Sequence, residues 1–90
     1  MMELILDGGL LRFDGEVIEL FSERGNSDRY HIRYLNKLEF AEGRKGITLL
    51  NLRYGGGGGF SGWIIPEENM GQAQQFMNAV QNAQAALRKN

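Results

Sequence analysis

Apolar and polar residues alternate along the chain as far as Pro66, and beyond it the apolar residues recur at the spacing of a helix. The clearest alternation is at residues 30–34 (YHIRY). A period of two is typical of strands with one buried face, and turns such as residues 14–15 (DG) separate these segments. The order predicts an α+β fold, with six to seven short antiparallel strands over about residues 3–66 and one helix over about 68–88.

Polar and glycine-rich segments predict the longer connections between the strands. Residues 22–28 (SERGNSD) and 43–46 (GRKG) supply Gly and Asn where a positive φ is required. Residues 47–54, between two such loops, carry apolar side chains on both faces of a strand. The five glycines at 55–59 are followed by a strand, whereas a phosphate-binding loop opens a helix with Lys and Ser or Thr, so they predict a flexible hairpin loop.

The segment after Pro66 has the pattern of an amphipathic helix that lies across a core. Its apolar stripe consists of Met70, Ala73, Phe76, Met77, Val80, Ala83 and Leu87. We expect Phe76 and Val80 to be buried against a strand layer. That layer is predicted to include Ile47, Leu49 and Ile64.

Capping signals mark both ends of this helix. Asn69 is the predicted N-cap, and Gln72 follows at the spacing of a capping box. The adjacent Glu67 and Glu68 point in different directions, so we expect them to complement the helix dipole and not to act as a catalytic acid and base. The basic residues that complement the other end are Arg88 and Lys89.

Composition bounds the domain count and several function classes. Ninety residues leave room for one core, so residues 1–90 form a single domain. The 10 basic and 11 acidic side chains are interleaved and give a net charge of -1, which does not predict nucleic-acid binding. Without cysteine there is neither a disulfide nor a Cys-based zinc site. No leader and no apolar run of about 20 residues is found, so we expect a cytoplasmic protein that does not span a membrane.

Four segments in this order resemble bacterial pleckstrin-homology-like domains: LLRFDGEVIELF, HIRYLNKLEFAE, GITLLNLRY and FSGWIIPEENMGQAQQFMNAV. The resemblance implies a bent antiparallel barrel or orthogonal sandwich of seven strands, capped at one end by the C-terminal helix. It also implies a binding or docking module and no enzymatic activity. Family members that bind phosphoinositides carry basic residues near the first loop. This chain has residues 7–9 (DGG) and 14–16 (DGE) there, so phosphoinositide binding is not expected.

Two groups of basic residues are candidates for an anionic ligand. Arg29, His31 and Arg33 form the outward face of one predicted strand, and Arg44 and Lys45 lie at a hairpin tip. Such charges also protect sheet edges and interact with solvent, which is the alternative explanation. As the only histidine, His31 cannot build a catalytic triad or a metal shell alone. No catalytic residue, metal or cofactor is predicted.

The outer face of the predicted helix lacks charge, because no charged residue occurs between Glu68 and Arg88. Depletion of charge marks the centre of many protein interfaces, although Gln and Ala are also good helix formers on a solvated face. The candidate interface residues are Gln72, Gln75, Asn78, Ala79 and Asn82. We therefore expect a non-catalytic binding or assembly module that contacts a protein partner or a second copy. A peripheral membrane or anionic-ligand module is the alternative, and a small enzyme comes third.

Overall fold

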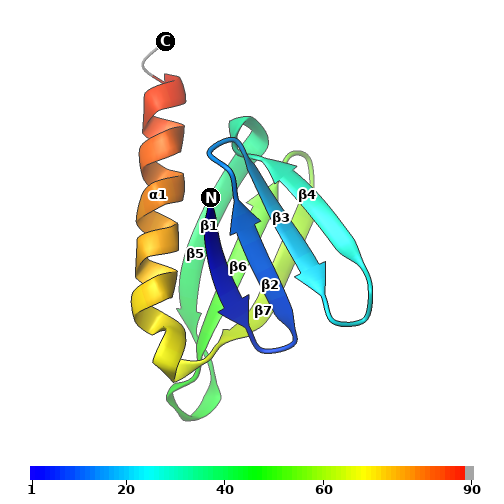
Figure 1. Ribbon diagram of the computed structural model, residues 1–90, viewed down its shortest axis with the longest axis vertical. Coiled ribbons are helices and arrows are strands. Elements are labelled where there is room, and N and C mark those ends of the chain that lie inside the picture. The colour runs from blue at the N-terminus through cyan, green and yellow to red at the C-terminus, as the bar shows by residue number, and fades with distance from the viewer. Residues whose placement is uncertain (89–90) are drawn as a thin grey trace.

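The computed structural model describes residues 1–88 and confirms an α+β fold, with two antiparallel sheets and one C-terminal helix (Figure 1). The predicted helix-end charge at Lys89 lies outside the described residues. The first sheet has the order β1-β2-β3-β4. Its strands are β1 (Met2–Leu6), β2 (Gly9–Phe13), β3 (Val17–Ser22) and β4 (Ser27–His31). The second sheet contains β5 (Leu35–Glu42), β6 (Thr48–Tyr54) and β7 (Gly58–Ile65), and the helix is α1 (Met70–Arg88).

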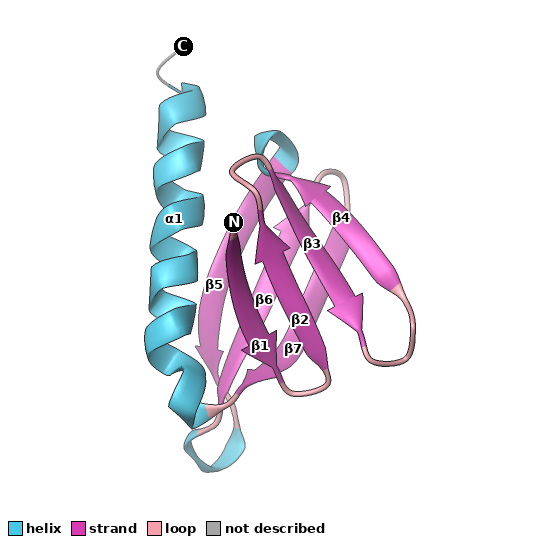
Figure 2. Cartoon of the chain, in the orientation of Figure 1, coloured by secondary structure: helices cyan, strands magenta, loops and turns pink. Residues whose placement is uncertain are grey.

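The two sheets form two layers, and α1 runs along the side where β1 and β5 are the outer strands (Figure 2). Within residues 1–88 no strand ladder joins the sheets, so the strands do not form a closed barrel. At one corner, the Asp7 N–H donates a hydrogen bond to the Ile64 carbonyl over 2.9 Å. The sheets are held together mainly by the side chains between them.

The prediction of a continuous strand through residues 30–34 is wrong. β4 ends at His31, and a 3₁₀ turn at Ile32–Tyr34 leads the chain from the first sheet into the second. The His31 Nδ1 accepts a hydrogen bond from the Arg33 N–H over 3.1 Å, and the Ile32 N–H donates to the Glu16 carbonyl over 2.9 Å. Tyr30 and Ile32 are both buried, so burial still alternates along residues 30–32 as it would in a strand, although the backbone turns at Ile32.

The core lies between the sheets and beneath α1. Phe76 and Val80 are 1% and 0% exposed, as predicted, and the Phe76 ring lies 6.2 Å from that of Phe13. The inner face of β6, however, is the one that carries Leu50 and Leu52. We predicted that the helix would pack against a strand layer that includes Ile47, Leu49 and Ile64. This prediction is wrong, because none of the three belongs to the core. Because β6 has apolar residues on both faces, its sequence pattern does not determine which face is buried.

The residues predicted to cap the helix contact β1 instead. A short 3₁₀ turn, Glu67–Asn69, precedes α1. The Asn69 side-chain amide donates to the Ile5 carbonyl over 3.1 Å, and the Ile5 N–H donates to Gln72 Oε1 over 3.4 Å. These two amides satisfy backbone groups at the free edge of the first sheet, so the beginning of α1 protects that edge.

We predict that Phe76→Ala destabilises the domain by about 3 to 5 kcal/mol, because it leaves a cavity between the sheets. Thermal denaturation should show a fall in Tm of at least about 10 °C. Gln75→Ala is the matched control, since Gln75 is exposed on the adjacent position of the same helix. Equal Tm values for the two variants would contradict this account of the core.

Candidate functional site

Four of the five predicted interface residues are exposed on α1, and three of them share one stripe. Gln75, Asn78 and Asn82 follow the spacing of one helical stripe and are exposed; we call them the helix stripe. Ala79 is half-buried and packs against the core, so its assignment to the outer face is wrong. Gln72 is exposed, but its side-chain oxygen accepts the hydrogen bond from Ile5.

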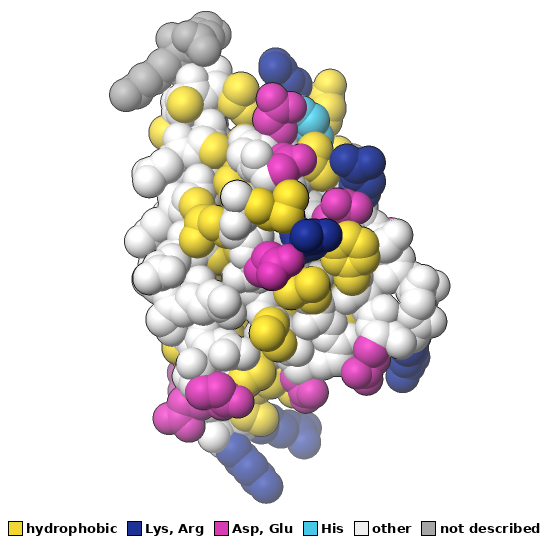
Figure 3. All heavy atoms as spheres, in the orientation of Figure 1, with side chains coloured by type: hydrophobic (Ala, Val, Ile, Leu, Met, Phe, Trp, Pro, Cys, Tyr) yellow, Lys and Arg dark blue, Asp and Glu magenta, His cyan; other side chains and the backbone are white. Residues whose placement is uncertain are grey.

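An apolar row crosses the outer face of the first sheet beside the helix. Ile5 pairs with Leu10, and Leu10 pairs with Phe21, on three adjacent strands. Ile5 is 55% exposed, and the other two side chains of the row are half-buried. Figure 3 shows hydrophobic side chains gathered over this sheet beside the uncharged surface of α1. The sequence carried a signal for this row, namely apolar residues at both odd and even positions of these strands.

A ladder of alternating charges flanks the apolar row. Glu3, Arg12, Glu19 and Arg29 pair in this order across the four strands of the first sheet. Arg12 Nε lies 3.0 Å from Glu3 Oε2 but donates no hydrogen bond, so that contact is electrostatic. The guanidinium of Arg12 also lies 5.9 Å from the centre of the Phe21 ring. Arg29 Nε is 3.9 Å from Glu19 Oε2, which partly neutralises this predicted anion-binding residue.

The other predicted anion-binding residues are separated in the fold. Arg33 lies in the 3₁₀ turn and not on a strand with Arg29, so the prediction of one basic strand face is wrong. His31 Nε2 lies 4.0 Å from Glu16 Oε2. The β5–β6 loop, which carries Arg44 and Lys45, is at the opposite end of the molecule from the turn between β4 and β5 (Figure 1). The basic residues therefore do not form one contiguous patch.

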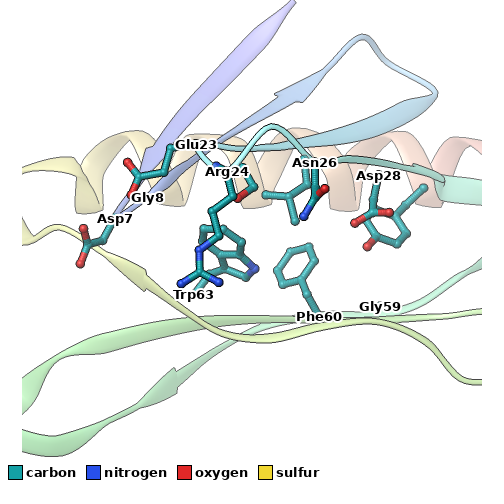
Figure 4. Close-up of a pocket in the computed structure, with 12 residues that line it drawn as sticks. Asp7, Gly8, Glu23, Arg24, Asn26, Asp28, Gly59, Phe60 and Trp63 are labelled. Atoms are coloured by element: carbon teal, nitrogen blue, oxygen red, sulfur yellow. Dashed lines mark hydrogen bonds between the residues drawn. The ribbon is translucent and has the colours of Figure 1, made fainter.

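A cleft of about 540 Å³ opens between the β3–β4 loop and β7 (Figure 4). Its apolar walls include the rings of Tyr30, Phe60 and Trp63. The ring centres of Tyr30 and Phe60 are 5.9 Å apart, and those of Phe60 and Trp63 are 6.5 Å apart. We call this feature the aromatic cleft. No pattern in the sequence predicted this cleft.

A β-bulge in β7 places Phe60 and Trp63 on the same face. These two residues pair with Leu52 and Leu50, so β7 has two residues where β6 has one. Gly62, in the bulge, has φ +77° and donates its N–H to Asn51 Oδ1 over 2.8 Å. Without the extra residue, side chains three positions apart would point to opposite faces of the sheet.

Gly9 allows Trp63 to pack directly against the backbone of β2. A Cβ atom at Gly9 would lie 2.7 Å from Trp63 Cζ3 and 3.1 Å from the Phe21 carbonyl oxygen. A Cβ atom at 2.7 Å would force Trp63 to move, and 3.1 Å from a backbone oxygen is tighter than most Cβ contacts. The glycine at this position therefore fixes one wall of the aromatic cleft.

Charged residues surround the mouth of the cleft. Asp7, Glu23 and Asp28 contribute carboxylates, and Arg24 contributes a guanidinium. Burial raises the pKa of the Tyr30 phenol above its ordinary value of 10.0, and the nearby Asp28 carboxylate raises that pKa further.

The described part of the chain shows no group of three or more His, Asp or Glu side chains arranged to hold a metal ion. Among the same residues, no helix has the length and apolarity needed to cross a bilayer. No family model, curated protein or solved structure matches the chain.

We predict that Gly9→Ala displaces Trp63 and changes the emission maximum of tryptophan fluorescence, because the new methyl group would overlap the indole. Trp63 is the only tryptophan, so the signal reports on the cleft alone. Gly56→Ala is the control, since a Cβ there meets nothing within 4 Å. Identical spectra for Gly9→Ala and the parent protein would contradict the proposed packing.

The raised pKa of Tyr30 predicts a loss of stability at alkaline pH. The folded state favours the neutral phenol, so this stabilisation is complete below about pH 10 and is lost as pH rises through the folded-state pKa. Tyr30→Phe should reduce the alkaline pH dependence of the free energy of unfolding, measured with urea. Tyr34→Phe, at a 58% exposed position, should leave it unchanged. The same slope in both variants would contradict the prediction.

Proposed function

We propose that the chain is a non-catalytic protein-binding module of the pleckstrin-homology-like type. Its partner contacts a docking face formed by the apolar row (Ile5, Leu10 and Phe21) and the helix stripe. The observation that carries this proposal is the exposed Ile5, whose backbone is hydrogen-bonded to the beginning of an uncharged helix surface.

The architecture supports the family assignment within this proposal. Four antiparallel strands are followed by three, and a single helix at the end of the chain lies along one side of the two sheets. The resemblance of the sequence implies the same order of elements.

The energetics of desolvation favour a protein partner on the docking face. Burial of apolar surface contributes about 25 cal/mol per Å², and the uncharged amides of the helix stripe avoid the cost of desolvating ions. The 19-residue helix is about 28 Å long, which together with the adjacent strands offers an area on the order of an ordinary protein interface. The charge ladder would form part of a polar rim.

Two observations make the alternatives weaker. The candidate anion-binding residues lie at separate ends of the molecule, and Arg29 is close to an acidic partner. An enzyme would need at least two polar groups with shifted pKa values in one cleft. Tyr30 has such a shift, but Asp14, whose pKa is lowered by the N–H groups of Val17 and Glu16, lies on the β2–β3 turn and does not line the aromatic cleft.

The test uses a photo-crosslinking amino acid in place of Gln75 in cells that express the protein. We expect a discrete crosslinked product that decreases about tenfold when Ile5→Glu is introduced, because a buried carboxylate replaces a buried apolar group. Ile47→Glu is the matched control, since Ile47 is exposed but lies beside the β5–β6 loop.

The mass of the product, together with light scattering of the purified protein, distinguishes a second copy of the chain from a different protein. Both variants must first show the parent Tm. If folded Ile5→Glu and Ile47→Glu proteins crosslink equally, or if no product forms at position 75, the docking face is not a binding surface.

A further inference from the structure

The aromatic cleft has the properties of a ligand site that is separate from the docking face. It lies between the β3–β4 loop and β7, on the side of the sheets away from α1 (Figure 1). Its volume of about 540 Å³ is within the range of small-molecule pockets, about 300 to 1,000 Å³. Two features of the backbone set the positions of its aromatic walls: the bulge at Gly62 and the absence of a side chain at Gly9.

The net charge at the mouth of the cleft indicates the sign of the charge on its ligand. Three carboxylates (Asp7, Glu23 and Asp28) and one guanidinium (Arg24) give a net charge of -2. None of these four side chains belongs to an ion pair within residues 1–88. The carboxylates therefore retain their attraction for an incoming cation.

The aromatic walls of the cleft also attract a cation. The planes of Phe60 and Trp63 lie at 84° to each other in an edge-to-face pair, and both residues line the cleft. The faces of aromatic rings carry negative charge density and attract ammonium and guanidinium groups, Trp most strongly. A cation with an apolar arm could contact the rings and the carboxylates together.

The chain itself places a cation at the mouth of the cleft. Arg24 is one of the residues that line it, and Figure 4 shows its side chain extending from the β3–β4 loop toward the cleft. Arg24 is an exposed residue of the β3–β4 loop, and the next residue, Gly25, has φ +92°. The Arg24 side chain can leave for solvent without breaking an ion pair of the described chain.

We propose that the aromatic cleft binds an organic cation, an alkylammonium or guanidinium group on an apolar arm, which takes the place of the Arg24 side chain. The carboxylates of Asp28 and Glu23 supply the charge that attracts it, and Phe60 and Trp63 supply the aromatic walls. This site is independent of the docking face, because none of its lining residues belongs to the apolar row or the helix stripe.

The experiment titrates the folded protein with choline and follows the fluorescence of Trp63. A saturable change is expected with choline, and none with its neutral carbon isostere, dimethylbutanol. Side-chain NMR shifts of Phe60 and Trp63 provide a second measurement. A parallel titration uses Nα-acetyl-lysine methylamide, which keeps the side-chain ammonium group and mimics a lysine in a protein. Tighter binding of this compound would indicate a lysine of a protein as the ligand, and tighter binding of choline would indicate a free organic cation.

Charge variants give effects of opposite sign. Asp28→Asn should weaken choline binding by about three- to tenfold, since it removes one neighbouring charge, and Arg24→Ala should strengthen it by a similar factor because the competing cation is gone. Glu42→Gln, at an exposed position outside the cleft, should have no effect.

Three results would overturn the proposal: no saturable change with either cation in both measurements, equal binding of choline and dimethylbutanol, or weaker binding by folded Arg24→Ala. Ile5→Glu should bind choline like the parent protein. A failure of the docking face would therefore leave this result unchanged, and the two proposals can be tested separately.

Discussion

The packing of α1 against the two sheets closes the core of the domain. No strand ladder joins the sheets within residues 1–88, and the hydrogen bond from Asp7 to Ile64 links them at one corner. Phe76 and Val80 fill the open side and complete a single core with side chains from both sheets. The inner side of the helix must therefore be apolar, whereas the sheets place no such requirement on its outer side.

Irregularities in the strands shape the surface opposite the helix. An unbroken β7 would turn either Phe60 or Trp63 away from the interior, because successive residues of a strand alternate between faces. The bulge at Gly62 restores both side chains to the same face, and Gly9 removes the side chain that would occupy the space of Trp63. Glycine serves here to position aromatic rings.

The docking face and the aromatic cleft differ in chemistry in a way that suits different partners. The docking face combines exposed apolar groups with uncharged amides, which favours the burial of a broad protein surface. The aromatic cleft combines rings with unneutralised carboxylates, which favours a small cationic group. Under the two proposals, one domain presents both surfaces on a common core, so one ligand can bind without displacing the other.

Local sequence patterns predict the strand-rich first two thirds of the chain, the single helix, the burial of Phe76 and Val80, and the absence of charge on the helix stripe. Each of these follows from local periodicity, which reflects how often a side chain returns to the same face. Three features are visible only in the folded chain: which face of β6 is buried, how the chain turns after His31, and the cleft that Phe60 and Trp63 share with Asp28. These features depend on strand register and on contacts between residues far apart in the chain, and a local pattern with apolar residues on both faces of a strand contains no information about either.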